Sequence, residues 1–157
     1  VGQAPGFKAS TTHGSIGFSE DFAGKRVTFP SHLAGFKPVC STEIMMFASI
    51  TAEFKAMGTR LIVLPVSALC ARIAEPETIH VLEWNGKRHA KVKFPRIENI
   101  RMELADMYGM IQPDQSKTQA ERAEYIIDPA GKVRTIFYCP LPIGRNSDGL
   151  RRIAQVL

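Results

Sequence analysis

The sequence lacks a long apolar run, and this absence bears on where the protein acts. No apolar stretch approaches the ~18–20 residues that a membrane-spanning helix needs. The first ten residues, VGQAPGFKAS, also lack the apolar segment of a signal peptide. We therefore expect no membrane span. Cytoplasm is the expected compartment by default, although a mature secreted chain would show the same pattern.

Cysteine is scarce as well. The chain has Cys40, Cys70 and Cys139, an odd number in 157 residues, which does not fit the short, cysteine-rich domains that disulfides hold together. No two of them form a CxxC pair, and none stands at metal-ligand spacing from a histidine. The sequence therefore predicts no metal site and no bound cofactor. It favours a reducing compartment in which at least one thiol is a candidate for reactivity.

A concentrated basic stripe is also missing. The net charge is +5, but lysine and arginine are scattered, and the densest group contains only Lys87, Arg88, Lys91 and Lys93. This distribution indicates a solvated basic surface and disfavours nucleic acid as a partner. With 45% apolar and 22% charged residues, the composition is that of a soluble globular protein. We expect a single domain over residues 1–157.

The pattern of apolar residues predicts an α/β fold. Residues 1–24 are expected to form loops and short strands, and Pro30–Pro38 a turn-rich loop. The predicted strands are Lys25–Phe29, Arg60–Val66, Val92–Ile97, Glu121–Asp128 and Val133–Tyr138. The predicted helices are Cys40 to about Met57, Ser67–Leu82, Ile100–Tyr108 and Asp148–Leu157. Strands that alternate with helices and end in a hairpin indicate a mixed sheet flanked by helices.

Two segments carry the clearest pattern. In the first long helix, apolar residues recur at three- and four-residue spacing, and Gly58 follows as a stop signal. These residues are Ile44, Phe47, Ile50, Phe54 and Met57. The continuous run LIVLPV within Arg60–Val66 is typical of a buried central strand. Because a central strand cannot spare a backbone donor, we place Pro65 at its C-terminal end.

Cys40 is the cysteine whose position has a chemical consequence. It stands where the Pro-rich loop meets the predicted helix, with Pro38 expected to keep the entry extended and outside the helix. The first-turn N–H groups and the helix dipole favour an anion, so the pKa of a thiol there can fall from about 8.5 into the ~3.5–7.5 range. The thiolate would then be a nucleophile for a peroxide oxygen or a disulfide. The alternative is a small, inert side chain that fills space.

Four collinear segments resemble the peroxiredoxins (AhpC/TSA family), and in particular their one-cysteine-like subgroup. SHLAGFKPVCSTE (Ser31–Glu43) is similar to the subgroup's active-site segment, which typically reads SHPADFTPVCTTE. The other segments are APGFKASTTHG near the start, ERAEYIIDPAGKVRTI (Glu121–Ile136), and PLPIGRNSDGLRRIAQVL (Pro140–Leu157) with its GRN motif. The resemblance covers essentially the whole chain. It implies a thioredoxin-like fold and the activity of an antioxidant peroxidase.

The resemblance also implies roles for individual residues. Cys40 matches the peroxidatic cysteine, which attacks the terminal peroxide oxygen and becomes a sulfenic acid. Arg122 matches the arginine beside that thiol, and Arg145 matches the second arginine. Glu43 matches the acidic residue that helps hold the arginines. His32 matches a histidine of the subgroup's loop. The resemblance is equally compatible with a catalytic role for this histidine and with no chemical role.

Two departures from the family pattern fall in the loop before Cys40. The family has a Pro that shields the thiolate and a Thr whose hydroxyl orients the peroxide, whereas this chain has Leu33 and Lys37. Leu33 can still shield the thiolate. Protonated Lys37 cannot accept a hydrogen bond, although its charge would favour the thiolate. A slow or specialised peroxidase and a family member that has lost the reaction are both compatible with these changes.

The resemblance bears on the remaining cysteines and on assembly. Cys70 is expected to be a buried structural thiol. Cys139 is expected to fill space at a strand end, and it is the better of the two candidates for a second redox thiol. A chain that stops at Leu157 would lack the subgroup's C-terminal region. The sulfenic acid would then be reduced by an outside thiol such as thioredoxin or glutathione, or by Cys70 or Cys139 after a local rearrangement. A homodimer is the family expectation.

Two functions from different classes follow. The first is a thiol-dependent peroxidase that reduces hydrogen peroxide or alkyl hydroperoxides through Cys40. The second is an impaired peroxiredoxin-fold protein that acts as a redox sensor, a chaperone-like protein or a binding subunit. A disulfide reductase is disfavoured because there is no CxxC pair. An ordinary thiol pKa at Cys40, near 8.5 or above, would count against both redox roles.

Overall fold

A computed structural model describes residues 2–32, 38–65, 83–84, 87–88, 93–97, 103–111, 122–139 and 145–156. The side chains of residues 32, 38–42, 65, 83–84 and 87–88 lie outside this description. Leu33, Lys37 and the predicted helix Ser67–Leu82 with Cys70 also lie outside it.

The centre of the fold is a mixed sheet, as predicted. Strand β3 (Arg26–His32) pairs in parallel with β4 (Thr59–Leu61) and β5 (Leu64–Pro65) on one side, and antiparallel with β8 (Arg122–Ile127) on the other. The hairpin partner of β8 is β9 (Val133–Cys139), which stands at the edge of the described sheet. The predicted hairpin is confirmed. In its turn, the Asp128 carboxylate accepts hydrogen bonds from the Ala130 and Lys132 N–H groups at 2.9 Å each.

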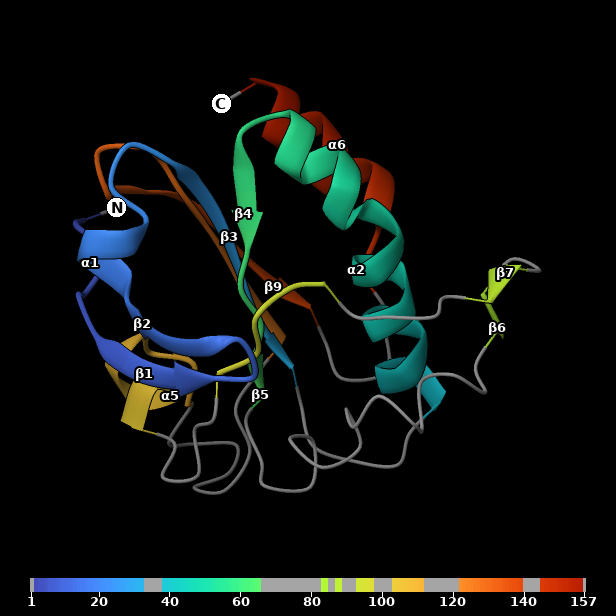
Figure 1. Ribbon diagram of the computed structural model, residues 1–157, viewed down its shortest axis with the longest axis horizontal. Helices are drawn as coiled ribbons and strands as arrows, with labels where there is room; N and C mark the ends of the chain where they lie inside the picture. Colours follow the sequence, from blue (N-terminus) through green and yellow to red (C-terminus); the bar gives the residue numbers. More distant parts are fainter. Residues whose placement is uncertain are drawn as a thin grey trace.

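Other elements cover both faces of this sheet (Figure 1), and each face has its own hydrophobic core. Helices α2 (Pro38–Ala56) and α6 (Ser147–Val156) cover one face, where Phe47, Ile50 and Phe54 are buried. The other face is covered by the hairpin of β1 (Lys8–Thr11) and β2 (Gly14–Gly17), together with α1 (Phe18–Asp21) and α5 (Glu103–Met107). Residues along β8 alternate between the two faces, because successive side chains of a strand point in opposite directions.

Helix α2 begins earlier than predicted. Pro38 is its first residue, whereas we expected Pro38 to stand outside the helix. Proline suits the first helical position, because its fixed φ is helical and the N–H that it lacks would have no partner inside the helix. Cys40 is consequently the third residue of α2 and lies in the first turn. The predicted apolar pattern is confirmed by the burial of Ile44, Phe47, Ile50 and Phe54.

Strand β3 runs further than predicted, so the expected loop at Pro30–Pro38 is wrong for its first three residues. Proline cannot donate to a sheet, which argued against a strand at Pro30. The Ser31 hydroxyl supplies contacts to the neighbouring strand instead. It accepts a hydrogen bond from the Ala123 N–H at 2.8 Å and donates one to the Ala123 carbonyl at 3.1 Å. A side chain therefore joins β3 to β8 next to the proline.

The predicted strand Arg60–Val66 is divided into β4 and β5. Leu61, Ile62, Val63 and Leu64 are all buried, as the continuous apolar run indicated. At Val63 the hydrogen bonds change direction, since its N–H donates to the Pro95 carbonyl at 3.1 Å and its carbonyl accepts from the Ile97 N–H at 2.9 Å. The predicted position of Pro65, at the end of the described strand, is confirmed.

The predicted strand Val92–Ile97 is not regular in its described part, residues 93–97. Only single bridges form there, between Val63 and Arg96 and between Thr11 and Ile97. Pro95 has no N–H to donate, and Arg96 bonds Thr12 through the Thr12 N–H and hydroxyl, which interrupts a regular ladder. Sequence reasoning also missed helix α1 and the two-residue strands β6 (Glu83–Trp84) and β7 (Lys87–Arg88).

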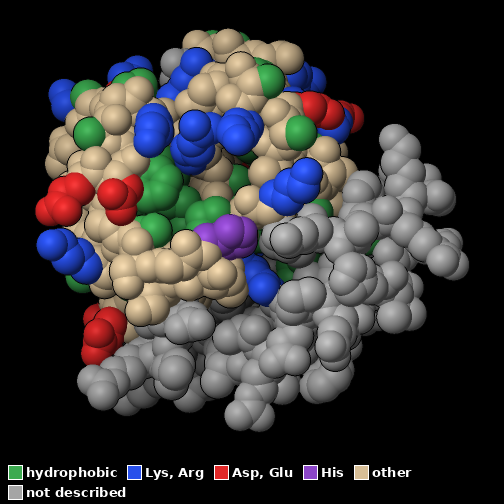
Figure 2. All heavy atoms as spheres, viewed as in Figure 1, with side chains coloured by type: hydrophobic (Ala, Val, Ile, Leu, Met, Phe, Trp, Pro, Cys, Tyr) green, Lys and Arg blue, Asp and Glu red, His purple; other side chains and the backbone are tan. Residues whose placement is uncertain are grey.

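The described surface is mixed in charge. Figure 2 shows several neighbouring lysine and arginine side chains across the middle of one face and others around its rim, with acidic side chains toward both sides. Among the helices described, none combines the length and apolar character that crossing a membrane requires.

Candidate active site

A cluster of buried charged side chains lies between α2 and the sheet. Glu43, on α2, accepts at Oε1 from Arg122 Nη1 at 3.1 Å and at Oε2 from Arg145 Nη1 at 3.2 Å. Only 2–3% of each of these side chains is exposed. Burying charges is costly unless they are paired, and here one carboxylate joins two guanidinium groups. The structure thus brings together Glu43, Arg122 and Arg145, three of the predicted site residues.

Arg145 is fixed by the backbone as well. Its Nη2 donates to the carbonyl oxygens of Ser31 at 2.7 Å and Ala123 at 3.0 Å, where β3 and β8 meet. Its own N–H donates to Glu43 Oε1 at 3.2 Å, and its guanidinium lies 5.8 Å from the centre of the Phe47 ring. A cation over an aromatic face is attracted by the ring electrons. Together these contacts hold the Arg145 guanidinium in a single orientation.

The residue after Arg145 explains why the chain enters the site here. Asn146 accepts hydrogen bonds at Oδ1 from the N–H groups of Asp148 at 2.9 Å and Gly149 at 3.4 Å. Asparagine at this place is an N-cap, which satisfies donors that the first helical turn leaves open. The arginine and asparagine of the GRN motif therefore do different work. Arg145 binds Glu43 and the strands, and Asn146 starts α6.

Glu124 joins the cluster and was missed in the sequence. It lies two residues after Arg122 on the same face of β8, is 1% exposed, and places Oε2 at 3.3 Å from Arg145 Nε. Burial raises the pKa of Glu124 to about 7; the charge of Arg145 lowers it and the charge of Glu43 raises it. The available signal was a charged residue within the otherwise apolar strand AEYII, at the spacing that places it beside Arg122.

Cys40 is connected to this cluster through α2. It precedes Glu43 by three residues, and residues at that spacing are neighbours on a helix surface, with about 5–6 Å between their Cβ atoms. The first turn of α2 also contributes the positive end of the helix dipole. His32 is the last residue of β3, and its side chain lies outside the description, as does all of Lys37. The described geometry therefore places the backbone of Cys40 one helical turn before the carboxylate that holds two guanidinium groups.

This arrangement is suited to anions and to oxygen atoms that gain negative charge. Guanidinium groups in a buried site are always charged and already oriented, so they stabilise developing charge without reorganising. In the described residues, no group of three or more His, Cys, Asp or Glu side chains could hold a metal ion. Cys139, the last residue of β9, is partly exposed, forms no disulfide and stands opposite Arg122 in the strand register.

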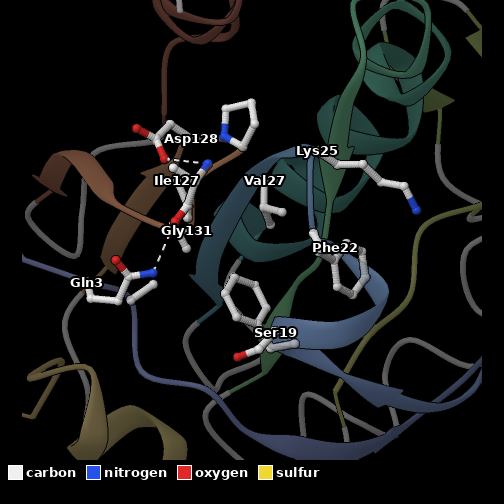
Figure 3. Close-up of a pocket in the computed structure, with 13 residues that line it drawn as sticks. Gln3, Ser19, Phe22, Lys25, Val27, Ile127, Asp128 and Gly131 are labelled. Carbon is white, nitrogen blue, oxygen red and sulfur yellow. Dashed lines mark hydrogen bonds between the residues drawn. The ribbon is translucent and has the colours of Figure 1, made fainter.

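A separate cavity of about 140 Å³ lies at the opposite end of these strands (Figure 3). Val27 at the start of β3 and Ile127 at the end of β8 line it, together with Phe22 and Lys25, whereas the charged cluster contacts Ser31 and Arg122. Gln3 closes one side by donating to the Ala130 carbonyl at 3.1 Å. This cavity is not part of the candidate site.

Comparison with known proteins assigns the chain to a family. Residues 2–136 match the model of the AhpC/TSA family. The chain is 46% identical to a peroxiredoxin of Methanosarcina mazei over 155 residues, which are 98% of this chain and 71% of that protein. It is 40% identical to a peroxiredoxin of Aquifex aeolicus over 154 residues, which are 98% of this chain and 67% of that protein.

Solved structures agree. A yeast mitochondrial 1-Cys peroxiredoxin superposes with a TM-score of 0.78 at 31% identity, over 96% of this chain and 72% of that one. Peroxiredoxin 6 of Arenicola marina, as a cysteine-to-serine mutant, gives a TM-score of 0.79 at 25% identity, over 96% and 69%. These likenesses confirm the predicted thioredoxin-like fold.

Proposed function

Because the chain belongs to the AhpC/TSA family, we propose that Cys40 is the thiol with which this peroxidase reduces peroxides. The observation that carries the assignment is the position of Cys40 in the first turn of α2, three residues before a buried glutamate that holds Arg122 and Arg145. The relatives are peroxiredoxins, which favours a thiol-dependent peroxidase over a binding protein that has lost the reaction.

The chemical step follows from the charges. The Cys40 thiolate attacks the terminal oxygen of a hydroperoxide, an S–O bond forms, and the O–O bond breaks. The electron pair of that bond leaves with the second oxygen, which takes a proton and departs as water or an alcohol. Sulfur is oxidised to a sulfenic acid and the peroxide is reduced. Arg122 and Arg145 stabilise first the thiolate and then the leaving oxygen.

The sulfenic acid must be reduced before a second turnover. We assign this step to an outside thiol of the thioredoxin or glutathione type, in a reducing compartment such as the cytoplasm. The support is that the partly exposed Cys139 forms no disulfide. The yeast mitochondrial relative is a protein whose thiol is resolved via glutathione and thioredoxin systems. Lys37 and His32 remain candidate contributors to the peroxide side of the site.

The chain is further proposed to form a homodimer through the edge of its sheet. Strand β9 stands at an edge of the described sheet, and Tyr138 on it is 49% exposed. An unpaired edge of this kind can bond a second copy of the same strand. Sedimentation velocity at micromolar concentration should give about twice the mass of one chain. A Tyr138→Pro substitution removes an N–H that faces the open edge of β9 and should shift the distribution toward monomer. A monomer of the unchanged chain at all concentrations would contradict the dimer.

Stopped-flow oxidation tests the enzyme assignment. Reduced protein mixed with hydrogen peroxide should lose its thiolate far faster than a free cysteine does. Mass spectrometry after trapping with dimedone should then locate the sulfenic acid on Cys40, with Cys70 and Cys139 unlabelled. Oxidation no faster than that of free cysteine would refute the peroxidase. Fast oxidation with the label on another cysteine would refute the assignment to Cys40 alone.

A further inference from the structure

Glu124 is a buried acid that the step proposed above does not use. Its carboxylate lies within ion-pair distance of Arg145, yet neither of its oxygens accepts a well-directed hydrogen bond from any described residue. Its neighbours across the strands are Pro30 on β3 and Phe137 on β9, and neither side chain offers it a donor. Because no hydrogen bond from the described residues compensates for the loss of water, ionising this buried carboxyl group is costly. Its pKa is therefore raised toward neutral pH.

The charges around Glu124 come from three elements. Arg122 precedes it on β8, Glu43 faces it from α2, and Arg145 reaches it from the segment before α6. With Glu124 ionised, two guanidinium groups are balanced by two carboxylates. With Glu124 protonated, the cluster keeps one net positive charge. The charge offered to an anion at Cys40 therefore depends on one proton.

We propose that Glu124 is a positioning residue that acts on the reactive thiol through Arg145, with its ionisation setting how much positive charge the arginines offer to the peroxide. This inference rests on Cys40 being the peroxidatic thiol. With Glu124 protonated, Arg145 keeps its contacts with Glu43 and the strands, but less of its positive charge is neutralised, and that charge favours the thiolate and the leaving oxygen. Ionised Glu124 draws on the same guanidinium and weakens that stabilisation.

The direction with pH follows. Since burial raises the pKa of Glu124 to about 7, the acid is mostly protonated at pH 5.5 and mostly ionised at pH 8.5. The rate constant for oxidation of Cys40 by hydrogen peroxide should therefore rise as the thiol ionises and then fall across the neutral range. The expected change in this rate constant is about three- to tenfold.

The test is the pH profile of that rate constant in Glu124→Gln. Glutamine keeps the shape and an oxygen for Arg145 but cannot ionise. We expect the variant to match the wild type at pH 5.5 and to be about three- to tenfold faster at pH 8.5. Glu124→Asp, which still ionises, should restore the fall. Glu53→Gln, which removes an exposed carboxylate from the same helix as Cys40, should leave the profile unchanged.

The outcomes separate the two proposals. A wild type without rapid oxidation of Cys40 refutes the proposed function. Rapid oxidation with superimposable wild-type and Glu124→Gln profiles refutes the role of Glu124 alone.

If Glu124→Gln does not fold, carbon-13 NMR of the Glu124 carboxyl group tests the same inference. Because coupling between two sites is reciprocal, its titration midpoint should be lower in Cys40→Ser than in the reduced wild type. An unchanged midpoint would overturn the inference.

Discussion

Replacing Cys40 by serine should lower the rate of oxidation by hydrogen peroxide by about a thousandfold or more. A serine hydroxyl does not ionise near neutral pH, even in the first turn of a helix. The variant then lacks the thiolate that would attack the peroxide, so the S–O bond of the first step cannot form. Because the side chains of Glu43, Arg122 and Arg145 hold one another, the buried cluster should persist in the variant. Circular dichroism should therefore be unchanged.

Single-turnover stopped flow measures this loss without depending on the reductant. Cys139→Ser is the matched control, since Cys139 is partly exposed and forms no disulfide. It should retain the wild-type rate of the first oxidation, whatever its effect on later reduction. If Cys40→Ser stayed within tenfold of the wild type while Cys139→Ser lost the fast phase, the catalytic thiol would have been assigned to the wrong cysteine.

The second large effect concerns stability. Glu43→Gln should reduce the free energy of unfolding by about 3–5 kcal/mol, because it removes the carboxylate charge that two buried guanidinium groups share. Glutamine keeps the size of the side chain, so the loss measures charge and hydrogen bonding rather than a cavity. The same change should also slow peroxide oxidation, since Arg122 and Arg145 would no longer be held beside the first turn of α2.

Urea unfolding followed by circular dichroism gives this difference, and α2 supplies its own control. Glu53 also pairs with an arginine, Arg151, at 2.7 Å, but more than half of the Glu53 side chain is exposed. Glu53→Gln should cost about 0.2–1 kcal/mol, as exposed ion pairs do. Equal losses for the two variants would show that the buried position of Glu43 contributes nothing special.

Much of the fold was predictable because its strongest signals are local. The spacing of Ile44, Phe47, Ile50 and Phe54 fixed α2, and the turn at Asp128 fixed the β8–β9 hairpin. The extension of β3 through Pro30 could not be predicted. It depends on contacts with distant segments: Ser31 pairs with Leu64 on β5, and its hydroxyl bonds Ala123, which is 92 residues away in the sequence.

The candidate site shows the same division. A resemblance to known motifs selected Glu43, Arg122 and Arg145, and their contacts are present in the structure. The sequence analysis missed Glu124 because it belongs to no known motif. Only the pairing of the strands and the position of Arg145 in the folded chain show that Glu124 faces the cluster. A charge in a strand is ordinarily read as a solvent-facing position, and tertiary packing reverses that reading here.

The contacts of Arg145 have a consequence for the newly made chain. Arg145 bonds Ser31 on β3, Ala123 on β8 and Glu43 on α2, so the site closes only when its own segment arrives. Roughly a hundred residues separate Cys40 from Arg145, which a ribosome takes roughly 5–20 seconds to add at about 5–20 residues per second. During that interval Glu43 lacks first both of the arginines that it binds in the folded protein and then one of them. With Cys40 as the peroxidatic thiol, we expect a nascent chain to react more slowly with peroxides than the folded protein does.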